Sequence, residues 1–203
     1  MNYPKQKKLT IGIDIDNVIA DSYPSYIIEF NKRFSTNVKY EEVFDFYHLE
    51  KHVGIGKKKS SHFIETILHS EDFQLAIPPF EKPKEIIENW SKSGFIIHYI
   101  TSRPIATKKV TLQWLTNHGF LVRNAKLHLL DIQLHDKDTD YKKEIVDKWK
   151  VDILIEDNKT IALVMNIPVL LLDRPWNQGK LQKNVIRVKD WEEIDQYVAK
   201  ILR

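Results

Sequence analysis

The chain has 203 residues, of which 42% are hydrophobic and only six are glycine, so it can form one domain with a modest insertion and is not a fibrous or linker-dominated protein. Its formal net charge of +3 comes from 31 basic and 28 acidic residues, a balance that gives no case for binding a nucleic-acid polymer. No cysteine is present, which excludes disulfides, zinc–thiolate sites and cysteine nucleophiles.

We expect a cytoplasmic protein with no membrane partner. Asp14 and Asp16 interrupt the apolar run near the N-terminus, whereas a signal peptide needs an uncharged apolar core. No window approaches the roughly 20 apolar residues of a membrane-spanning helix. The sequence carries no indication of an oligomeric state.

Short apolar runs recur along the chain, separated by amphipathic stretches. Each run has the length of a strand, and several are apolar nearly throughout, as in strands that are covered on both faces. The predicted strands are Leu9–Ile15, Phe95–Ile100, Leu127–Leu130, Asp152–Ile155, Val169–Leu172 and, more weakly, Val185–Val188.

Helices are predicted between and after these strands. Gly94 and Gly119 follow two of them, at a position where the end of a helix favours glycine. The predicted helices are Pro83–Ser93, Ala106–His118, Tyr141–Trp149, Lys159–Met165 and Trp191–Leu202. Because strands alternate with helices, we predict an α/β fold with a Rossmann-like, three-layer, mostly parallel sheet.

One segment breaks this alternation. Residues 21–79 lack a convincing strand but contain helical patterns at Tyr26–Phe34 and Ser60–Leu68, and Pro78 and Pro79 mark the return to the core. We therefore predict a core formed by residues 1–20 and 80–203, and a small helical cap formed by residues 21–79 and inserted after the first strand.

Two acidic residues end the first predicted strand. Asp14 and Asp16 are two positions apart, so on an extended segment their side chains point to the same side. The carboxyl edge of a parallel sheet is where such folds bind ligands. Two carboxylates held together there need a cation or a shared proton to relieve their repulsion. Alone, the pattern also fits a turn that happens to use Asp and Asn.

Polar residues end two further strands. Thr101, followed by Ser102 and Arg103, could bind phosphate oxygens, although Ser102 could equally cap the next helix. Glu156 and Asp157 end the fourth strand. Lys142 lies at the start of the helix before it, and the joint order of carboxylates, hydroxyl and ammonium is more informative than any one of them.

Taken together, these segments resemble the four ordered motifs of the haloacid dehalogenase (HAD) superfamily, and the resemblance spans the predicted core. In phosphatases of that superfamily the first motif is Asp-x-Asp. The resemblance implies that Asp14 attacks phosphorus to form an aspartyl-phosphate and that Asp16 is the general acid and base. It also implies that Thr101 holds a phosphate oxygen and that Lys142 offsets the negative charge.

The resemblance further implies a Mg²⁺ ion. Asp14, the backbone of Asp16, and the pair Glu156 and Asp157 would hold it with the hard oxygen ligands that Mg²⁺ prefers. Such a cation is needed because a phosphate monoester dianion repels a carboxylate nucleophile. Asn17 stands where the superfamily usually has Gly, which could alter the turn.

Within the superfamily, the chain is most similar to the 5′(3′)-deoxyribonucleotidases and related bacterial nucleotidases. The likeness rests on Asp-x-Asp-x-Val-x-Ala-Asp, the cap directly after it, and Ile-Thr-Ser-Arg-Pro. Since aromatic cap residues in that family stack on the base, Phe44, Phe46 and Tyr47 are candidates for substrate contacts. The same rings could instead form the core of the cap.

We therefore expect a phosphatase that acts on a small phosphorylated metabolite, a nucleoside monophosphate, with Ser102 and Arg103 as further candidates for substrate binding. A general sugar-phosphate or metabolite phosphatase is the alternative within the enzyme class. A non-catalytic phosphate-binding module on the same fold is the alternative outside it, but mere binding needs no nucleophile.

Overall fold

The computed structural model describes residues 8–45 and 48–202. Six strands form one sheet in the order β3-β2-β1-β4-β5-β6, and every pair of neighbours is parallel. The strands are β1 (Thr10–Ile13), β2 (Ile96–Pro104), β3 (Lys126–Leu130), β4 (Ile153–Glu156), β5 (Val169–Leu172) and β6 (Val185–Val188). The predicted α/β class and parallel sheet are confirmed.

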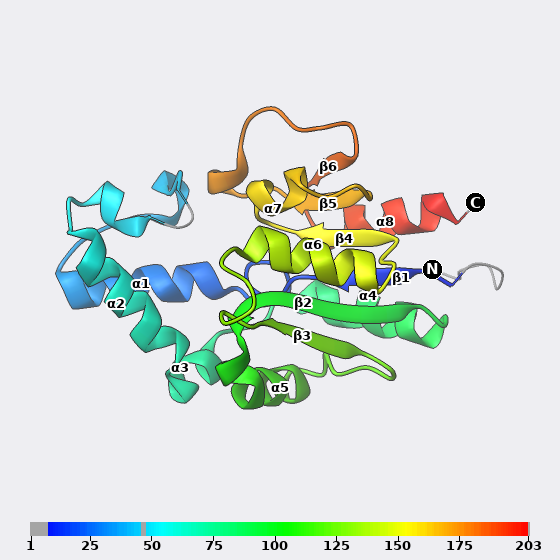
Figure 1. Cartoon of the computed structure of the whole chain (residues 1–203), viewed down its shortest axis with the longest axis horizontal. Coiled ribbons are helices and arrows are strands. Elements are labelled where there is room, and N and C mark those ends of the chain that lie inside the picture. The colour runs from blue at the N-terminus through cyan, green and yellow to red at the C-terminus, as the bar shows by residue number, and fades with distance from the viewer. Residues whose placement is uncertain (1–7, 46–47, 203) are drawn as a thin grey trace.

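Helices cover both faces of this sheet, which gives the three layers (Figure 1). The core on one face includes Trp90 of α4 (Glu81–Lys92), Trp114 of α5 (Lys108–Asn117) and Ile194 of α8 (Trp191–Ile201). The core on the other face includes Val146 of α6 (Asp138–Lys148) and Ile161 of α7 (Lys159–Leu163). Both faces of the central strands β1, β4 and β5 are therefore buried, as their nearly continuous apolar sequences predicted.

The strand order places the site. The chain builds β1, β2 and β3 outward in one direction and then returns to the other side of β1 for β4, β5 and β6. The point at which the direction reverses lies between β1 and β4, whose residues Ile13 and Ile155 are register partners. In open α/β sheets this reversal opens a crevice at the carboxyl ends of the strands.

The predicted cap segment, residues 21–79, contributes helices at that same end of the sheet, opposite the start of β1 and the end of α8 (Figure 1). They are α1 (Ser22–Phe34), α2 (Lys57–Leu68) and α3 (Glu71–Ala76), with single 3₁₀ turns at Tyr40–Glu42 and Leu49–His52. Helix α3 was not predicted. It is only six residues long, too short for a helical period to be visible, and it directly follows its capping residue Ser70, whose hydroxyl accepts a hydrogen bond from the N–H of Phe73.

The two ends of this segment lie side by side. The N–H of Asp21 donates to the carbonyl of Pro78 at 2.8 Å, and the N–H of Phe80 donates to the carbonyl of Ile19 at 2.9 Å. Two buried indoles anchor the flanking backbone: Trp191 donates to the carbonyl of Val18, and Trp114 to that of Ile77. We call this pair of strand-like ends the stem.

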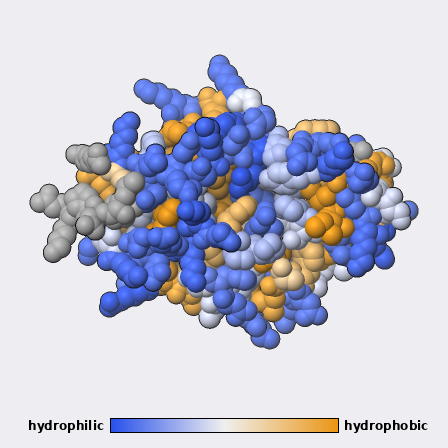
Figure 2. Space-filling view, turned by 180° about the vertical axis from the view of Figure 1, so that it is seen from behind, coloured by the Kyte–Doolittle hydropathy of each residue, from blue (hydrophilic) through white to orange (hydrophobic). Residues whose placement is uncertain are grey.

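The reverse side of the molecule is mostly hydrophilic, and its hydrophobic groups form separate patches, one of them over the end that carries the predicted cap segment (Figure 2). Among the helices within residues 8–45 and 48–202, none has the length and apolar composition needed to cross a membrane.

Candidate active site

Asp14 and Asp16 lie in a tight loop between β1 and α1. The N–H of Asp14 continues the sheet by donating to the carbonyl of Ile155 at 3.0 Å, and the N–H of Asn17 donates to that of Ala20 at 2.7 Å. Asn17 has a φ of 60°, in the left-handed region that Asn tolerates better than most non-glycine residues. Asn17 can therefore replace the usual Gly without opening the turn.

The side chain of Asn17 also does what a Gly could not. Its Oδ1 accepts a hydrogen bond from the N–H of Tyr23 at 2.9 Å and another from the hydroxyl of Ser22 at 3.3 Å. The residue that directly precedes α1, Asp21, makes no side-chain cap. Asn17 therefore satisfies one free N–H group at the start of α1, that of Tyr23, and ties the helix to the loop that holds Asp14 and Asp16.

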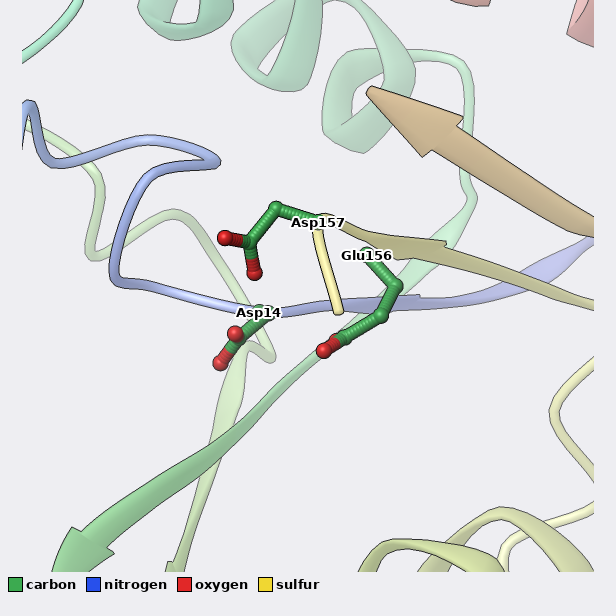
Figure 3. A group of neighbouring side chains, drawn as sticks. All are labelled: Asp14, Glu156 and Asp157. Carbon is green, nitrogen blue, oxygen red and sulfur yellow. The ribbon is translucent and has the colours of Figure 1, made fainter. Parts of the chain in front are cut away.

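Three carboxylates converge at the reversal point of the sheet. Asp14 directly follows β1, Glu156 is the last residue of β4, and Asp157 comes directly after Glu156 (Figure 3). One carboxylate oxygen from each of the three residues lies within 4.8 Å of the other two. All three are buried. Of the four predicted metal ligands, these three come together, whereas the carboxylate of Asp16 takes another partner.

One buried ammonium lies among these carboxylates. Lys142 of α6 has no exposed surface, and its Nζ lies 3.0 Å from Asp14 Oδ1 and 3.1 Å from Glu156 Oε2. Burial alone would lower the pKa of Lys142, but Asp14 and Glu156 outweigh burial and raise that pKa above its usual value. Lys142 is therefore charged at neutral pH.

A single ammonium does not balance three carboxylates. Burial raises the pKa of Asp14 and the pKa of Glu156, against the opposing charge of Lys142. Burial and then the charge of Asp14 raise the pKa of Asp157 to about 7. Such an excess of buried negative charge is relieved by protons or by a bound cation. The donor set, three hard carboxylate oxygens within reach of one another, suits Mg²⁺.

Asp16 is paired with Arg103 rather than with the three carboxylates. The guanidinium makes a two-pronged contact, from Nη2 to Asp16 Oδ1 at 2.7 Å and from Nε to Oδ2 at 2.8 Å. Burial would raise the pKa of Asp16, but Arg103 outweighs burial and lowers it. Arg103, predicted as a residue for substrate binding, is itself only 2% exposed. Its two-pronged contact also holds the carboxylate of Asp16 in place.

The residues of the Thr-Ser-Arg-Pro segment belong to the end of β2, which is longer than predicted. The register with β3 shifts between Thr101 and Pro104, which marks a bulge there. Ser102 does not cap α5, because the 3₁₀ turn Ile105–Thr107 intervenes. The Ser102 hydroxyl and the Nη1 of Arg103 are buried and have no hydrogen-bond partner within residues 8–45 and 48–202. Both are free to bind an oxygen of a ligand.

A cavity of about 240 Å³ opens above these groups. Its floor includes the Asp14, Asp16, Thr101, Lys142 and Asp157 side chains. Its walls include seven residues of the predicted cap segment: Ser22, Tyr23, Tyr26, Leu49, Ser60, Ile64 and Leu68. The cavity is therefore polar where the motifs meet and largely apolar toward the cap segment.

Of the three aromatic residues expected at this cavity, the structure describes one, and that one lies elsewhere. Phe44 is 65% exposed and does not line the cavity, and Phe46 and Tyr47 lie outside the described residues. Instead, Tyr23 and Tyr26 of α1 line it. The available signal was their position: the first turns of the helix that directly follows Asp-x-Asp must pass over the carboxyl edge of β1.

The polar turn after β5 was also missed. Its residues Arg174, Trp176 and Asn177 contact the loops that carry Asp14 and Asp157. The signal for it was again topological, because the carboxyl end of β5 lies beside that of β4.

Comparisons with known proteins agree with this arrangement. The chain matches the model of the family described as 5′ nucleotidase, deoxy (pyrimidine), cytosolic type C protein over residues 7–202. A protein of Halalkalibacterium halodurans that is named as a candidate nucleotidase is 27% identical over 208 residues, which cover 100% of this chain and 98% of that protein.

Solved structures show the same fold. A predicted phosphatase from Clostridium acetobutylicum superposes with a TM-score of 0.68 at 12% identity, covering 95% of this chain and 99% of that one. A haloacid dehalogenase-like hydrolase from Streptococcus pneumoniae gives a TM-score of 0.63 at 14% identity, covering 94% and 98%. With a HAD-like fold and a family match along nearly its whole length, the chain belongs to the cytosolic type C 5′ nucleotidase family and is a hydrolase of the HAD phosphatase type.

Proposed function

We propose that this enzyme is a Mg²⁺-dependent nucleotidase that hydrolyses nucleoside monophosphates through an aspartyl-phosphate on Asp14. The observation that carries the proposal is the buried cluster of Asp14, Glu156, Asp157 and Lys142 at the floor of a cavity. A site that only bound phosphate would gain nothing from burying carboxylates that repel it. Hydrolysis of phosphate monoesters follows from the family; the metal, the intermediate and the substrate are the proposal.

Asp14 is the proposed nucleophile. One carboxylate oxygen of Asp14 forms a bond to phosphorus while the bond from phosphorus to the leaving oxygen breaks. Lys142, 3.0 Å from Asp14 Oδ1, favours the ionised form of Asp14 against the effect of burial and offsets the charge of the approaching phosphoryl group. Thr101, Ser102 and the free Nη1 of Arg103 are proposed to bind phosphoryl oxygens.

Asp14, Glu156 and Asp157 are the residues that would hold Mg²⁺. When bound, the ion supplies the positive charge that lets a phosphate dianion approach a carboxylate. The backbone carbonyl of Asp16 remains the proposed fourth protein ligand.

Asp16 is the proposed acid and base. Protonated, it gives its proton to the leaving oxygen; ionised, it takes a proton from the water that attacks the aspartyl-phosphate and releases inorganic phosphate and Asp14. The ion pair with Arg103 favours the ionised form of Asp16, which is the form that the second step requires. In the first step the proton must reside on Asp16, so its contact with Arg103 must loosen when the substrate occupies the cavity.

Removal of the metal should abolish turnover. We expect release of phosphate from an aryl phosphate to stop in excess chelator and to return on addition of Mg²⁺, because a phosphate dianion must otherwise approach a buried group of three carboxylates that holds a single ammonium. Phosphate release measured with and without chelator, followed by Mg²⁺ titration, tests this. Undiminished activity in chelator would contradict the metal role.

We propose that residues 21–79 act as the cap that selects the substrate. The phosphoryl-binding groups treat every monoester alike, so selectivity must come from residues that contact the leaving group. Among the described residues, Tyr23 and Tyr26 are the aromatic ones that line the cavity, and their exposed fractions of 5% and 8% leave them shielded from bulk water. A base that enters the cavity could stack on either ring.

Replacing Tyr26 or Tyr23 by Leu, which keeps apolar bulk but removes the flat ring, tests the cap directly. A lost stacking contact of about 1–3 kcal/mol should raise KM for nucleoside monophosphates by about 5- to 150-fold for at least one of the two variants. KM for ribose 5-phosphate, the same substrate without a base, should stay nearly constant. Phe44→Ala is the matched control, since Phe44 lies outside the cavity.

If both tyrosine variants weaken the nucleotide and the sugar phosphate equally, the rings serve packing only. The alternative, a general sugar-phosphate or metabolite phosphatase, would then be favoured. Assays with deoxyribonucleoside monophosphates of pyrimidines and purines would further show whether the preference in the family's description holds here.

A further inference from the structure

Trp176 contacts one of the proposed metal ligands directly. It lies in the 3₁₀ turn Pro175–Asn177 after β5, and its indole Nε1 donates a hydrogen bond to Asp157 Oδ2 at 3.1 Å. An indole N–H can donate but cannot accept, and it does not change its protonation state near neutral pH. It therefore restrains a carboxylate oxygen without competing for a cation.

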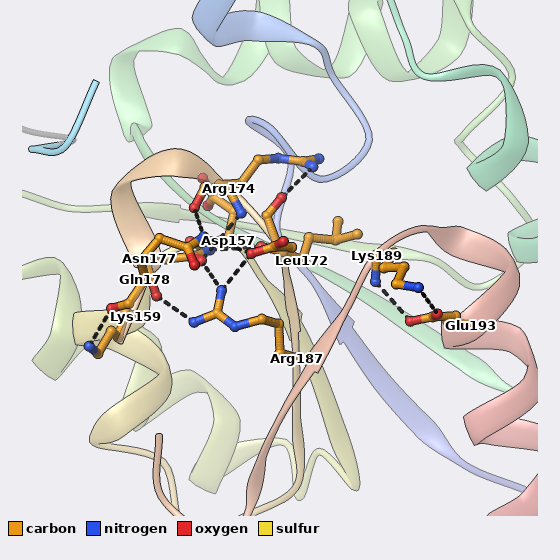
Figure 4. A network of polar contacts seen from close by, with 10 residues as sticks. Asp157, Lys159, Leu172, Arg174, Asn177, Gln178, Arg187, Lys189 and Glu193 are labelled. Carbon is orange, nitrogen blue, oxygen red and sulfur yellow. Dashed lines mark hydrogen bonds and ion pairs between the residues drawn. The ribbon is translucent and has the colours of Figure 1, made fainter. Parts of the chain in front are cut away.

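Asn177, the last residue of the turn that carries Trp176, is fully buried and anchors the turn through its side chain (Figure 4). The amide Nδ2 of Asn177 donates to the carbonyl of Asp157 and to that of Leu172, both at 2.7 Å. Arg187 of β6 donates to both oxygens of Asn177, from Nη1 to Oδ1 and from Nη2 to the backbone carbonyl, and pairs with Asp173 at 2.8 Å. The backbone of Asp157 and the turn are thus joined into one unit.

A second contact joins the same turn to the nucleophile loop. Arg174 donates from Nη2 to the backbone carbonyl of Asn17 at 2.7 Å. Asn17 is the residue whose side chain holds the start of α1. The turn after β5 therefore contacts both loops that supply carboxylates to the cluster.

On its other side, the Trp176 ring packs against aromatic residues of the proposed cap. The centroid of the Tyr23 ring lies 4.6 Å from that of Trp176, and the Tyr40 ring meets it edge-on at 5.6 Å. These distances are those of favourable aromatic pairs. The indole is thus confined between the cap rings and Asp157, which leaves its N–H aimed at the carboxylate.

We infer that Trp176 is a positioning residue for the metal site: it orients the Asp157 carboxylate toward the position that Asp14 and Glu156 share. The inference rests on the proposed role of Asp157 as a metal ligand. Partners that orient a ligand in this way commonly set metal affinity, and their loss typically weakens it by about 10- to 100-fold.

The test compares Mg²⁺ binding by calorimetry in the native chain and two tryptophan variants. Trp176→Phe keeps a ring against Tyr23 and Tyr40 but removes the donor. Trp149→Phe is the matched control, because Trp149 lies beside Lys126 and His128, away from the cavity. We expect the Kd for Mg²⁺ to rise about 10- to 100-fold in Trp176→Phe and to be unchanged in Trp149→Phe.

Kinetics separate positioning from a general loss of structure. At saturating Mg²⁺, Trp176→Phe should regain a kcat and a substrate KM close to the native values, whereas a damaged fold would not recover. If Trp176→Phe binds Mg²⁺ as tightly as the native chain, the inference is wrong. If the native chain itself binds no Mg²⁺, the proposed metal role fails, which is a different result.

Should Trp176→Phe not fold, the Trp149→Phe chain still tests the inference. This chain keeps Trp90, Trp114, Trp176 and Trp191, and of these only Trp176 contacts a proposed metal ligand in the described structure. A cation bound by Asp157 changes the electric field at the Trp176 N–H, so Mg²⁺ should change the tryptophan emission with the same midpoint as the calorimetric titration. An emission spectrum that stays constant while calorimetry shows saturation would overturn the inference.

Discussion

Replacing Asp14 by Asn should remove turnover while the protein remains folded. The change is nearly isosteric, but an amide is not a nucleophile toward phosphorus, so we expect a loss of roughly 10⁴- to 10⁶-fold, the scale for removing a nucleophile that acts within a catalytic unit. Lys142 keeps Glu156 as a partner at 3.1 Å, and one of the crowded negative charges is gone. The midpoint of thermal unfolding should therefore not fall.

Phosphate release under saturating Mg²⁺, together with circular dichroism and thermal unfolding, measures both parts of this prediction. Asp147→Asn is the matched control, because it removes a carboxylate at the surface of α6, where Asp147 pairs with Lys143. Substantial turnover by a folded Asp14→Asn protein would place the nucleophile elsewhere.

Replacing Asp16 by Asn should slow the reaction by about 10²- to 10⁴-fold, the usual contribution of general acid and base catalysis. The loss should depend on the leaving group. An aryl phosphate releases a stable phenolate and needs little protonation, whereas a nucleoside or an alkyl alcohol leaves as a strong base. We therefore expect a clearly smaller loss for the aryl phosphate.

The ion pair with Arg103 makes the leaving-group comparison necessary. Asn at position 16 leaves the buried guanidinium beside a neutral partner, and breaking a buried pair on one side is commonly destabilising by about 3–5 kcal/mol. Loss of structure alone would slow both substrates by the same factor, whereas loss of an acid would not. Equal losses on aryl and alkyl phosphates would count against Asp16 as the acid.

Much of the core could be predicted from the sequence because its signals are local. Val169–Leu172 and Val185–Val188 are strands with the predicted bounds. The alternation of such apolar runs with amphipathic stretches was enough to predict a parallel sheet. The convergence of Asp14 with Glu156 followed from a general rule, that parallel strands end at one edge, and needed no knowledge of side-chain contacts.

What could not be predicted depends on contacts between distant residues. Arg103 and Asp16 are 87 positions apart, and nothing in either neighbourhood indicates that one will neutralise the other. The choice between Phe44 and the tyrosines of α1 depends on how the segment folds back over the sheet, because both groups are aromatic residues of the same segment. Trp176 was missed because Asp157, to which it donates, lies 19 positions earlier in the chain, and nothing near either residue indicates the contact.

The stem has a consequence for how this enzyme can diverge. Its two backbone hydrogen bonds and two indole anchors hold the ends of the intervening segment together without help from the residues between them. We infer that residues of this segment away from its contacts with the active-site loops can be lengthened, shortened or exchanged with little disturbance to the placement of Asp14 against Lys142. Substitutions in this segment can then change which leaving groups the enzyme accepts, while the residues that cleave the phosphate ester keep their positions.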